Sequence, residues 1–124
     1  MAKRIDVLIA DDHSLFAEAL QAILGTDKRF KVVGLARDGK EAVSLASSLH
    51  PDIVLMDISM PVMDGFEATR RLRDQNEETC VLMLTGSNAR VDVDKARTAG
   101  AAGYVTKDRI AAELIDAILE VVSR

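Results

Sequence analysis

The chain has 124 residues, a length that suits one domain with a single buried core, and 48% of its residues are hydrophobic. Its formal net charge of -4 excludes a general nucleic-acid binder, because phosphate contacts need a basic surface. The single cysteine, Cys80, excludes an internal disulfide and favours a reducing compartment. The sequence shows no signal peptide and no apolar run near the roughly 18 residues of a membrane span, so we expect a cytoplasmic protein.

Short apolar runs alternate with amphipathic segments along the chain. The runs predict five strands, at residues 5–10, 31–36, 53–56, 80–84 and 103–106. Apolar residues at helical spacing predict helices at about 14–25, 39–49, 64–73, 90–100 and 111–122. This alternation indicates right-handed βαβ crossovers, and therefore an α/β fold with a doubly wound, five-stranded parallel sheet.

Local signals mark the ends of several helices. Ser14 is the expected N-cap of the first helix and Gly25 its stop. Asp38 and Asp64 are each followed three residues later by Glu, which is the spacing of a capping box. The arginines at 70, 71 and 73 are interpreted as the solvated face of the third helix. The segment 90–100 offers only small or β-branched apolar residues, so we expect it to pack weakly and to have low local stability.

Polar side chains follow four of the five strands. Asp11 and Asp12 come after the first strand, Asp57 after the third, Thr85 after the fourth and Lys107 after the fifth. The carboxyl ends of parallel strands meet at one edge of a sheet. If the strand order is 2-1-3-4-5, the three carboxylates lie at the switch point between strands one and three, where open α/β sheets bind ligands.

These residue types suit phosphoryl transfer assisted by magnesium. Three neighbouring carboxylates repel one another unless a cation is close, and hard oxygen ligands suit Mg²⁺ better than zinc. A carboxylate such as Asp57 can attack phosphorus to give an aspartyl phosphate, with charge on the transferring oxygens offset by Mg²⁺ and Lys107. Thr85 can donate a hydrogen bond to the new phosphoryl group.

Each of these residues, taken singly, also has a purely structural explanation as a turn, cap or surface residue. Their joint arrival at four strand ends favours the functional explanation. His13 lies next to Asp12, and we interpret it as a surface residue at the start of a helix.

The chain resembles the receiver domain of two-component response regulators over essentially its whole length, 1–124. The resemblance is carried by Asp11-Asp12, by the run from Asp57 to Gly65, by Thr85-Gly86 and by the run from Gly103 to Lys107. It implies the flavodoxin-like (CheY-like) fold, with strand order 2-1-3-4-5 and five helices. It also implies a signalling switch that catalyses only its own phosphorylation and slow autodephosphorylation.

The resemblance also assigns roles around the phosphoacceptor. Asp57 would receive phosphate from the histidine of a sensor histidine kinase. Asp12, Asp57 and the backbone carbonyl of Ser59 would bind Mg²⁺ directly, and Asp11 would bind it through water. Lys107 would contact the phosphoryl oxygens.

Two further roles concern the response to phosphorylation. Thr85 would be the switch hydroxyl and Tyr104 the switch aromatic that changes rotamer with it. The fourth helix, fifth strand and last helix would form the output face. Many receivers have proline after the lysine, whereas this chain has Asp108, which adds an acid near the site.

Several short motifs resemble receivers of the NarL/FixJ type; they lie at residues 11–13, 32–36, 39–42 and 100–104. In that subgroup a helix-turn-helix domain that binds DNA usually follows, and this chain ends just after its last helix. We therefore expect either the receiver part of a transcriptional regulator, which would contact DNA only through that absent domain, or a stand-alone receiver. The wide apolar stripe of the last helix permits a phosphorylation-dependent homodimer.

Two other classes fit the residues less well. A phosphatase of the haloacid dehalogenase type would carry its Asp-x-Asp nucleophile pair after the first strand, where this chain has two adjacent aspartates. A flavin binder would need Ser, Thr and Gly in that loop to hold phosphate, and Asp11-Asp12 would repel it.

Overall fold

A computed structural model describes residues 3–76, 78–86 and 90–123. The strands are β1 (Ile5–Ala10), β2 (Phe30–Ala36), β3 (Ile53–Asp57), β4 (Cys80–Thr85) and β5 (Gly103–Thr106). The helices are α1 (Ser14–Gly25), α2 (Gly39–Leu49), α3 (Gly65–Gln75), α4 (Arg90–Ala99) and α5 (Ile110–Val122), with a short 3-10 turn η1 (Lys107–Arg109) before α5. The predicted alternation of strands and helices is confirmed, with ends that differ by one or two residues.

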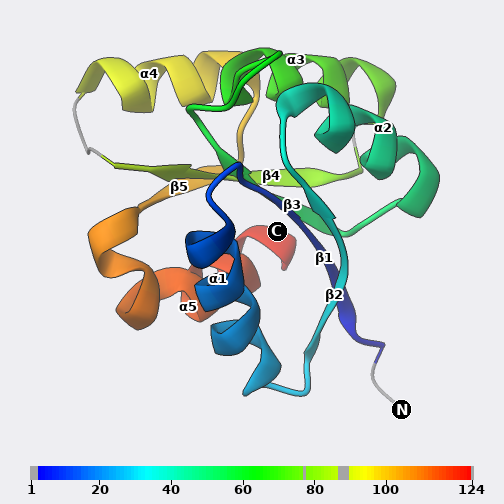
Figure 1. Ribbon diagram of the computed structural model, residues 1–124, viewed down its shortest axis with the longest axis vertical. Helices are drawn as coiled ribbons and strands as arrows, with labels where there is room; N and C mark the ends of the chain where they lie inside the picture. The colour runs from blue at the N-terminus through cyan, green and yellow to red at the C-terminus, as the bar shows by residue number, and fades with distance from the viewer. Residues whose placement is uncertain (1–2, 77, 87–89, 124) are drawn as a thin grey trace.

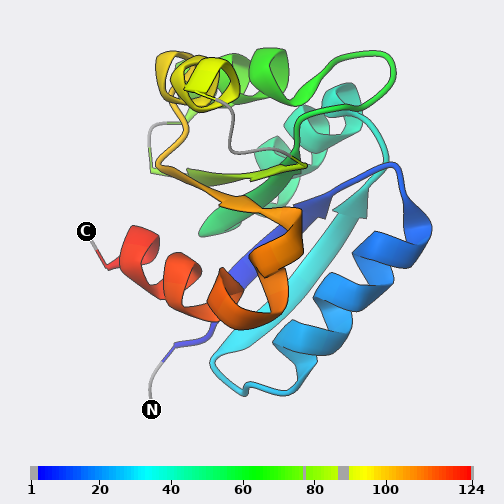
Figure 2. The same cartoon turned by 90° about the vertical axis from the view of Figure 1, so that its left-hand side faces the viewer.

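The strands form one parallel sheet in the order β2-β1-β3-β4-β5, as predicted. Helices α2, α3 and α4 cover one face of the sheet, and α1 and α5 cover the other (Figure 1). Figure 2, turned by 90°, shows the same two helical layers on either side of the strands. The strand order reverses direction between β1 and β3, which places the switch point between their carboxyl ends.

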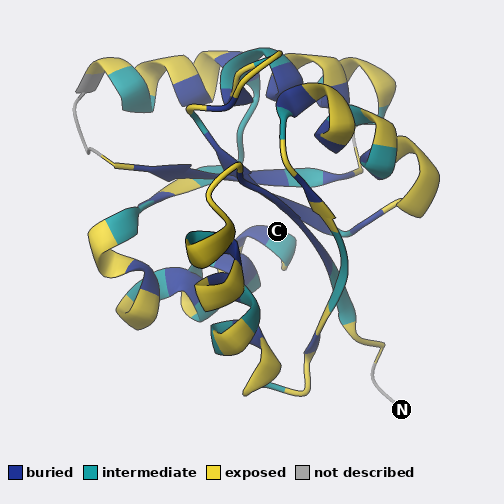
Figure 3. Cartoon of the chain, in the orientation of Figure 1, coloured by how far each residue is buried: buried dark blue, intermediate teal, exposed yellow. Residues whose placement is uncertain are grey.

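Alternation along the central strands divides the apolar residues between two cores. In β1, Val7 and Ile9 pack with α1 and α5, whereas Leu8 and Ala10 pack on the side of α2 and α3. β3 and β4 alternate in the same way. Burial on both faces explains why these strands are unbroken apolar runs, and Figure 3 shows them as the most continuously buried part of the chain.

The helix caps confirm two predictions and correct a third. The side chains of Asp38 and Asp64 accept hydrogen bonds from the backbone N–H groups of Glu41 and Glu67, at 2.7 and 2.9 Å. Ser14, the expected N-cap of α1, is instead its first helical residue, and the extended residue before it is His13. The chain turns one residue early because the backbone N–H of His13 donates to the Asp11 carboxylate.

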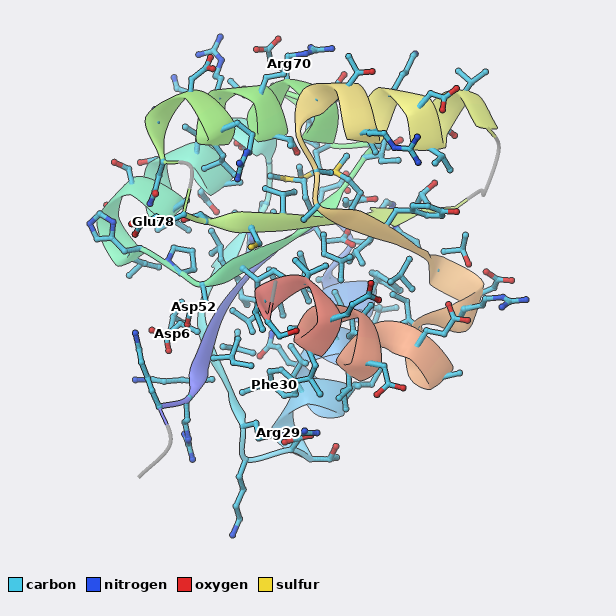
Figure 4. All side chains as sticks on the ribbon, turned by 180° about the vertical axis from the view of Figure 1, so that it is seen from behind. Asp6, Arg29, Phe30, Asp52, Arg70 and Glu78 are labelled. Atoms are coloured by element: carbon cyan, nitrogen blue, oxygen red, sulfur yellow. The ribbon has the colours of Figure 1, made fainter. Side chains whose placement is uncertain are left out.

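The arginines of α3 do not all lie on a solvated face. Arg70, labelled in Figure 4, points away from the sheet, and Arg71 is also exposed. Arg73 is half-buried, and its Nη1 donates to the backbone carbonyl of Thr79 at 3.0 Å. The prediction was wrong for Arg73 because the last turn of α3 faces the segment that leads into β4.

The two ends of the sheet differ in chemistry. At the amino end, the backbone N–H of Asp6 donates to the side chain of Asp52 at 2.8 Å, and both residues are labelled in Figure 4. The opposite, carboxyl end carries the polar side chains that the sequence singled out. In the described part of the chain, no helix has the length and apolar character needed to cross a membrane.

Candidate phosphoacceptor site

The strand register brings the predicted side chains to one edge. Asp57 is the last residue of β3 and pairs with Leu84 of β4, one residue before Thr85. Thr85 in turn pairs with Thr106 of β5, and Lys107 follows directly. Asp11 follows β1, and its backbone N–H donates to Ala36 at the end of β2.

A buried carboxylate and an ammonium group form the centre of this edge. Asp57 is only 3% exposed, and its Oδ1 lies 3.1 Å from Nζ of Lys107. The same Nζ lies 3.8 Å from Oδ2 of Asp11, whose side chain is fully buried. Lys107 also lies over the ring of Phe16, 4.6 Å from its centroid, a contact that favours a cation at this position.

The Asp57 carboxyl has a raised pKa. Burial is the main cause, since it disfavours the charged form, and the negative charge of Asp11 adds to it. The hydrogen bond and positive charge of Lys107 act in the opposite direction, and Asp12 raises the pKa further. The site therefore holds more negative charge than its one ammonium group balances.

Two buried oxygens indicate where further positive charge would fit. Asp11 Oδ2 and Asp57 Oδ2 accept no hydrogen bond from any residue that the structure describes. Asp11, Asp12, His13 and Asp57 offer ligand atoms that all lie within 4.8 Å of one another. Buried carboxylate oxygens without donors are suitable ligands for a hard divalent cation such as Mg²⁺, and the exposed Asp12 leaves room for water in its coordination sphere.

A cleft of about 280 Å³ opens beside Asp57 and Lys107. Thr85 and Ser59 line it, so three strand ends and the loop after β3 contribute to its wall. Asp92, in the first turn of α4, lines it as well and was not predicted. An acidic residue in the first turn of a helix is common because it interacts favourably with the helix dipole. The sequence therefore contains no separate indication that Asp92 faces the cleft.

The loop after β3 is held against the backbone of Asp57. The backbone N–H of Gly65 donates to the carbonyl of Ile58 at 2.8 Å. A side chain at Gly65 would clash with the carbonyl oxygen of Asp57, so only glycine fits this close approach. At the tip of the loop, Val62 has a φ of 70°, and the N–H of Met63 donates to the carbonyl of Pro61 in a tight γ-turn.

Comparison with known proteins agrees with this geometry. Residues 7–119 match the family described as the response regulator receiver domain. The chain belongs to this family. Its receiver sequence is 39% identical over 115 residues to the transcriptional regulatory protein DegU of Brevibacillus brevis, covering 93% of this chain and 49% of DegU.

Solved receiver structures superpose closely on this one. The receiver domain of the response regulator NarL from Mycobacterium tuberculosis has a TM-score of 0.94 and 33% identity, with 98% of each chain covered. A chain of the CheX-CheY-BeF3-Mg²⁺ complex from Borrelia burgdorferi has a TM-score of 0.89 and 27% identity, covering 96% of this chain and 90% of that one. The NarL and DegU matches support the predicted NarL/FixJ-like subgroup. The chain spans about half the length of the curated relatives it matches.

Tyr104 lies apart from the acidic cluster of this receiver. It is 43% exposed on β5 and lines a different cavity, of about 140 Å³, together with Ala96 and Arg97 of α4. Asp108, which stands where many receivers have proline, is exposed in the turn η1. Although Asp108 and not proline follows it, Lys107 still contacts Asp57.

The structure places His13 closer to the site than the sequence suggested. Its ring is 63% exposed, as expected for a surface residue, but Nδ1 lies 3.1 Å from Asp12 Oδ1 and 3.3 Å from Asp11 Oδ1. His13 also lines the cleft with Asp57. The position of this histidine directly after two aspartates at a strand end could have indicated that it lies at the site.

Proposed function

We propose that this receiver is a phosphorylation-activated switch in which Asp57 accepts a phosphoryl group from the histidine of a sensor histidine kinase. A carboxylate oxygen of Asp57 attacks phosphorus, the bond from phosphorus to the histidine nitrogen breaks, and its electron pair stays on that nitrogen. The observation that carries the proposal is the buried Asp57, with Oδ1 3.1 Å from Lys107 and Oδ2 lacking a donor among the described residues, on the wall of a cleft.

The chain's own residues would hold and neutralise the phosphoryl group. Lys107 would contact its oxygens, since its ammonium already lies beside the acceptor. Asp11, Asp12 and Asp57, with the backbone carbonyl of Ser59, would hold Mg²⁺, Asp11 through water. When bound, Mg²⁺ supplies the positive charge that offsets these carboxylates and the phosphoryl oxygens. The BeF3 and Mg²⁺ in the CheX-CheY complex support this assignment.

Thr85 and Tyr104 would pass the change to the output face, formed by α4, β5 and α5. A phosphoryl group adds about -1.5 to -2 charges at pH 7. Thr85 lies in the same cleft as Asp57 and would donate to that group, which draws the end of β4 inward. Tyr104, on β5, lines a cavity with residues of α4, where a change of its rotamer would alter the packing of the two elements.

In the whole protein, residues 1–124 would form the receiver domain of a DNA-binding transcriptional regulator that dimerises on phosphorylation. The match to DegU, a transcriptional regulator about twice as long, supports this over a stand-alone receiver. The family match also favours the switch over a phosphatase or flavin binder.

Intact-mass measurement after incubation with acetyl phosphate and Mg²⁺ tests the proposal. We expect a labile gain of one phosphate that Asp57→Asn lacks. This gain should decay slowly, through slow autodephosphorylation. No gain of mass, with steady turnover of a phosphomonoester, would overturn it.

A further inference from the structure

We propose that the His13 imidazole is a metal ligand, and that it makes this site select first-row transition cations over Mg²⁺. The inference rests on the metal site of the proposed function, and it adds a nitrogen donor to the oxygen ligands there.

The distances around His13 Nδ1 suit one shared cation. Nδ1 lies 3.1 Å from Asp12 Oδ1, 3.3 Å from Asp11 Oδ1 and 3.9 Å from Asp57 Oδ2. For ligands about 2.1 Å from a six-coordinate metal, adjacent ligand atoms lie about 3.0 Å apart and opposite ones about 4.2 Å apart. The distance to Asp12 is therefore close to that of adjacent ligands, and the distance to Asp57 is close to that of opposite ligands. The contact with Asp11, which would bind the metal through water, is within hydrogen-bonding distance.

An independent observation indicates a ligand at this point. Asp57 Oδ2, at the far end of that longest distance, is buried and accepts no hydrogen bond within the described residues. A buried carboxylate oxygen without a donor is costly, and a cation between it and His13 Nδ1 would satisfy it.

Capping does not explain the orientation of the ring. His13 occupies the N-cap position of α1, but its side chain makes no capping hydrogen bond in the described chain. The backbone instead fixes the residue, because the N–H of His13 donates to Asp11 Oδ1 at 2.8 Å. The ring is largely exposed, and its Nδ1 lies within hydrogen-bonding distance of Asp11 Oδ1 while also pointing toward the carboxylates of Asp12 and Asp57.

Ligand chemistry then sets the selectivity. Mg²⁺ binds oxygen and gains little from imidazole, whereas Mn²⁺, Co²⁺ and Ni²⁺ accept a nitrogen ligand, with affinity rising in that order. A site that adds one imidazole to the carboxylates of Asp12 and Asp57 should therefore favour Co²⁺ over Mg²⁺ by more than those carboxylates alone would.

The test uses Mn²⁺ and Co²⁺ on the whole chain, with His50→Asn as the matched control. His50 is the other histidine and has a φ of 48°, which asparagine tolerates. Electron spin-echo envelope modulation of bound Mn²⁺ reports a directly coordinated imidazole nitrogen. Calorimetric titration with Co²⁺ and with Mg²⁺ gives the affinity for each cation.

We expect nitrogen coupling in the parent and in His50→Asn, and none in His13→Asn. The Co²⁺ affinity of His13→Asn should fall by at least about tenfold, the smallest loss usual when even a partner of a metal ligand is removed. Its Mg²⁺ affinity should change by less than about twofold, because asparagine removes only the nitrogen donor.

Two other results would overturn the inference in distinguishable ways. If the parent shows no nitrogen coupling, or His13→Asn keeps the parent's ratio of Co²⁺ to Mg²⁺ affinity, while Asp57→Asn loses Mg²⁺, then His13 is not a ligand and the proposed function stands. If Asp57→Asn binds both cations like the parent, the metal site of the proposed function fails too.

Discussion

The ammonium nitrogen of Lys107 lies 3.1 Å from Oδ1 of the buried Asp57 carboxylate. The two side chains come from different strand ends, β5 and β3, so the contact exists only when the sheet is formed. It partly offsets a raised Asp57 pKa whose causes are burial and the neighbouring Asp11. The pair therefore links the folded state of the sheet to the protonation of the proposed acceptor.

Replacing Lys107 with methionine should raise the Asp57 pKa further. The substitution keeps an unbranched side chain beside Phe16 but removes the hydrogen bond and positive charge that lower this pKa. A titration of the Asp57 side-chain carboxyl carbon by NMR measures the change. Arg109→Met, which removes an exposed cation paired with Glu113, should leave the Asp57 pKa where it is. Equal pKa values in the parent and Lys107→Met would contradict the electrostatic assignment.

Asp57→Asn should increase the free energy of unfolding at pH 7. A carboxyl whose pKa is raised on folding stabilises the native state when protonated, and that contribution is lost as the pH rises through the folded pKa. Asparagine stays uncharged at neutral pH, so the substitution should stabilise the protein, by an amount within the range of about 0.5–2 kcal/mol that single stabilising substitutions commonly give.

The pH dependence provides the check on this explanation. The difference between Asp57→Asn and the parent should shrink as the pH falls through the raised pKa toward the unfolded value of 3.8. Urea unfolding at several pH values measures it. A difference that stays constant with pH would mean that the gain has another source.

Gly65→Ala should destabilise the protein and displace the acceptor. The added methyl group would clash with the backbone carbonyl of Asp57, so either α3 or the end of β3 must move. Overpacking of this kind costs about 1–3 kcal/mol. Gly25→Ala is the matched control, because a side chain there meets nothing within 4 Å.

Two measurements report the effect of these glycine substitutions. Guanidinium unfolding should show a loss for Gly65→Ala and little change for Gly25→Ala. The rate of phosphorylation by acetyl phosphate should also fall in Gly65→Ala alone. Equal stability of the two variants would contradict the expected clash at Gly65, and an unchanged phosphorylation rate in Gly65→Ala would show that Asp57 does not move.

Much of the architecture follows from local patterns in the sequence. The central strands bury both faces, so they appear as unbroken apolar runs, and each run ends at the polar residue that the sheet carries to its edge. The N-cap hydrogen bonds of Asp38 and Asp64 depend only on residues three apart, and both form. Strand-helix alternation predicts right-handed crossovers and a parallel sheet, whereas the order 2-1-3-4-5 came from the resemblance to receiver domains.

The features that the sequence did not predict depend on tertiary placement. Arg73 donates to Thr79 across a turn, and Asp92 lines the cleft because α4 packs beside α3 and β5. No residue pattern within α3 or α4 predicts these contacts, because each depends on a segment outside the helix. The start of α1 differs because the Asp11 side chain accepts the N–H of His13, a bond that competes with capping by Ser14.

Val62→Gly should stabilise the receiver by about 1 kcal/mol. Val62 has a φ of 70°, which a β-branched residue adopts only under strain of roughly 1–3 kcal/mol. Glycine relieves this strain, but part of the stabilisation is lost because glycine has more conformational entropy in the unfolded state. Because the side chain is 78% exposed, its removal loses little packing. The midpoint of urea unfolding should rise with an unchanged slope.

Val62→Ala separates β-branching from the positive φ, since it removes the branched side chain but retains a Cβ at positive φ. It should stabilise the protein less than Val62→Gly does. If alanine stabilises as much as glycine, the strain arises from β-branching alone and not from the positive φ of the γ-turn.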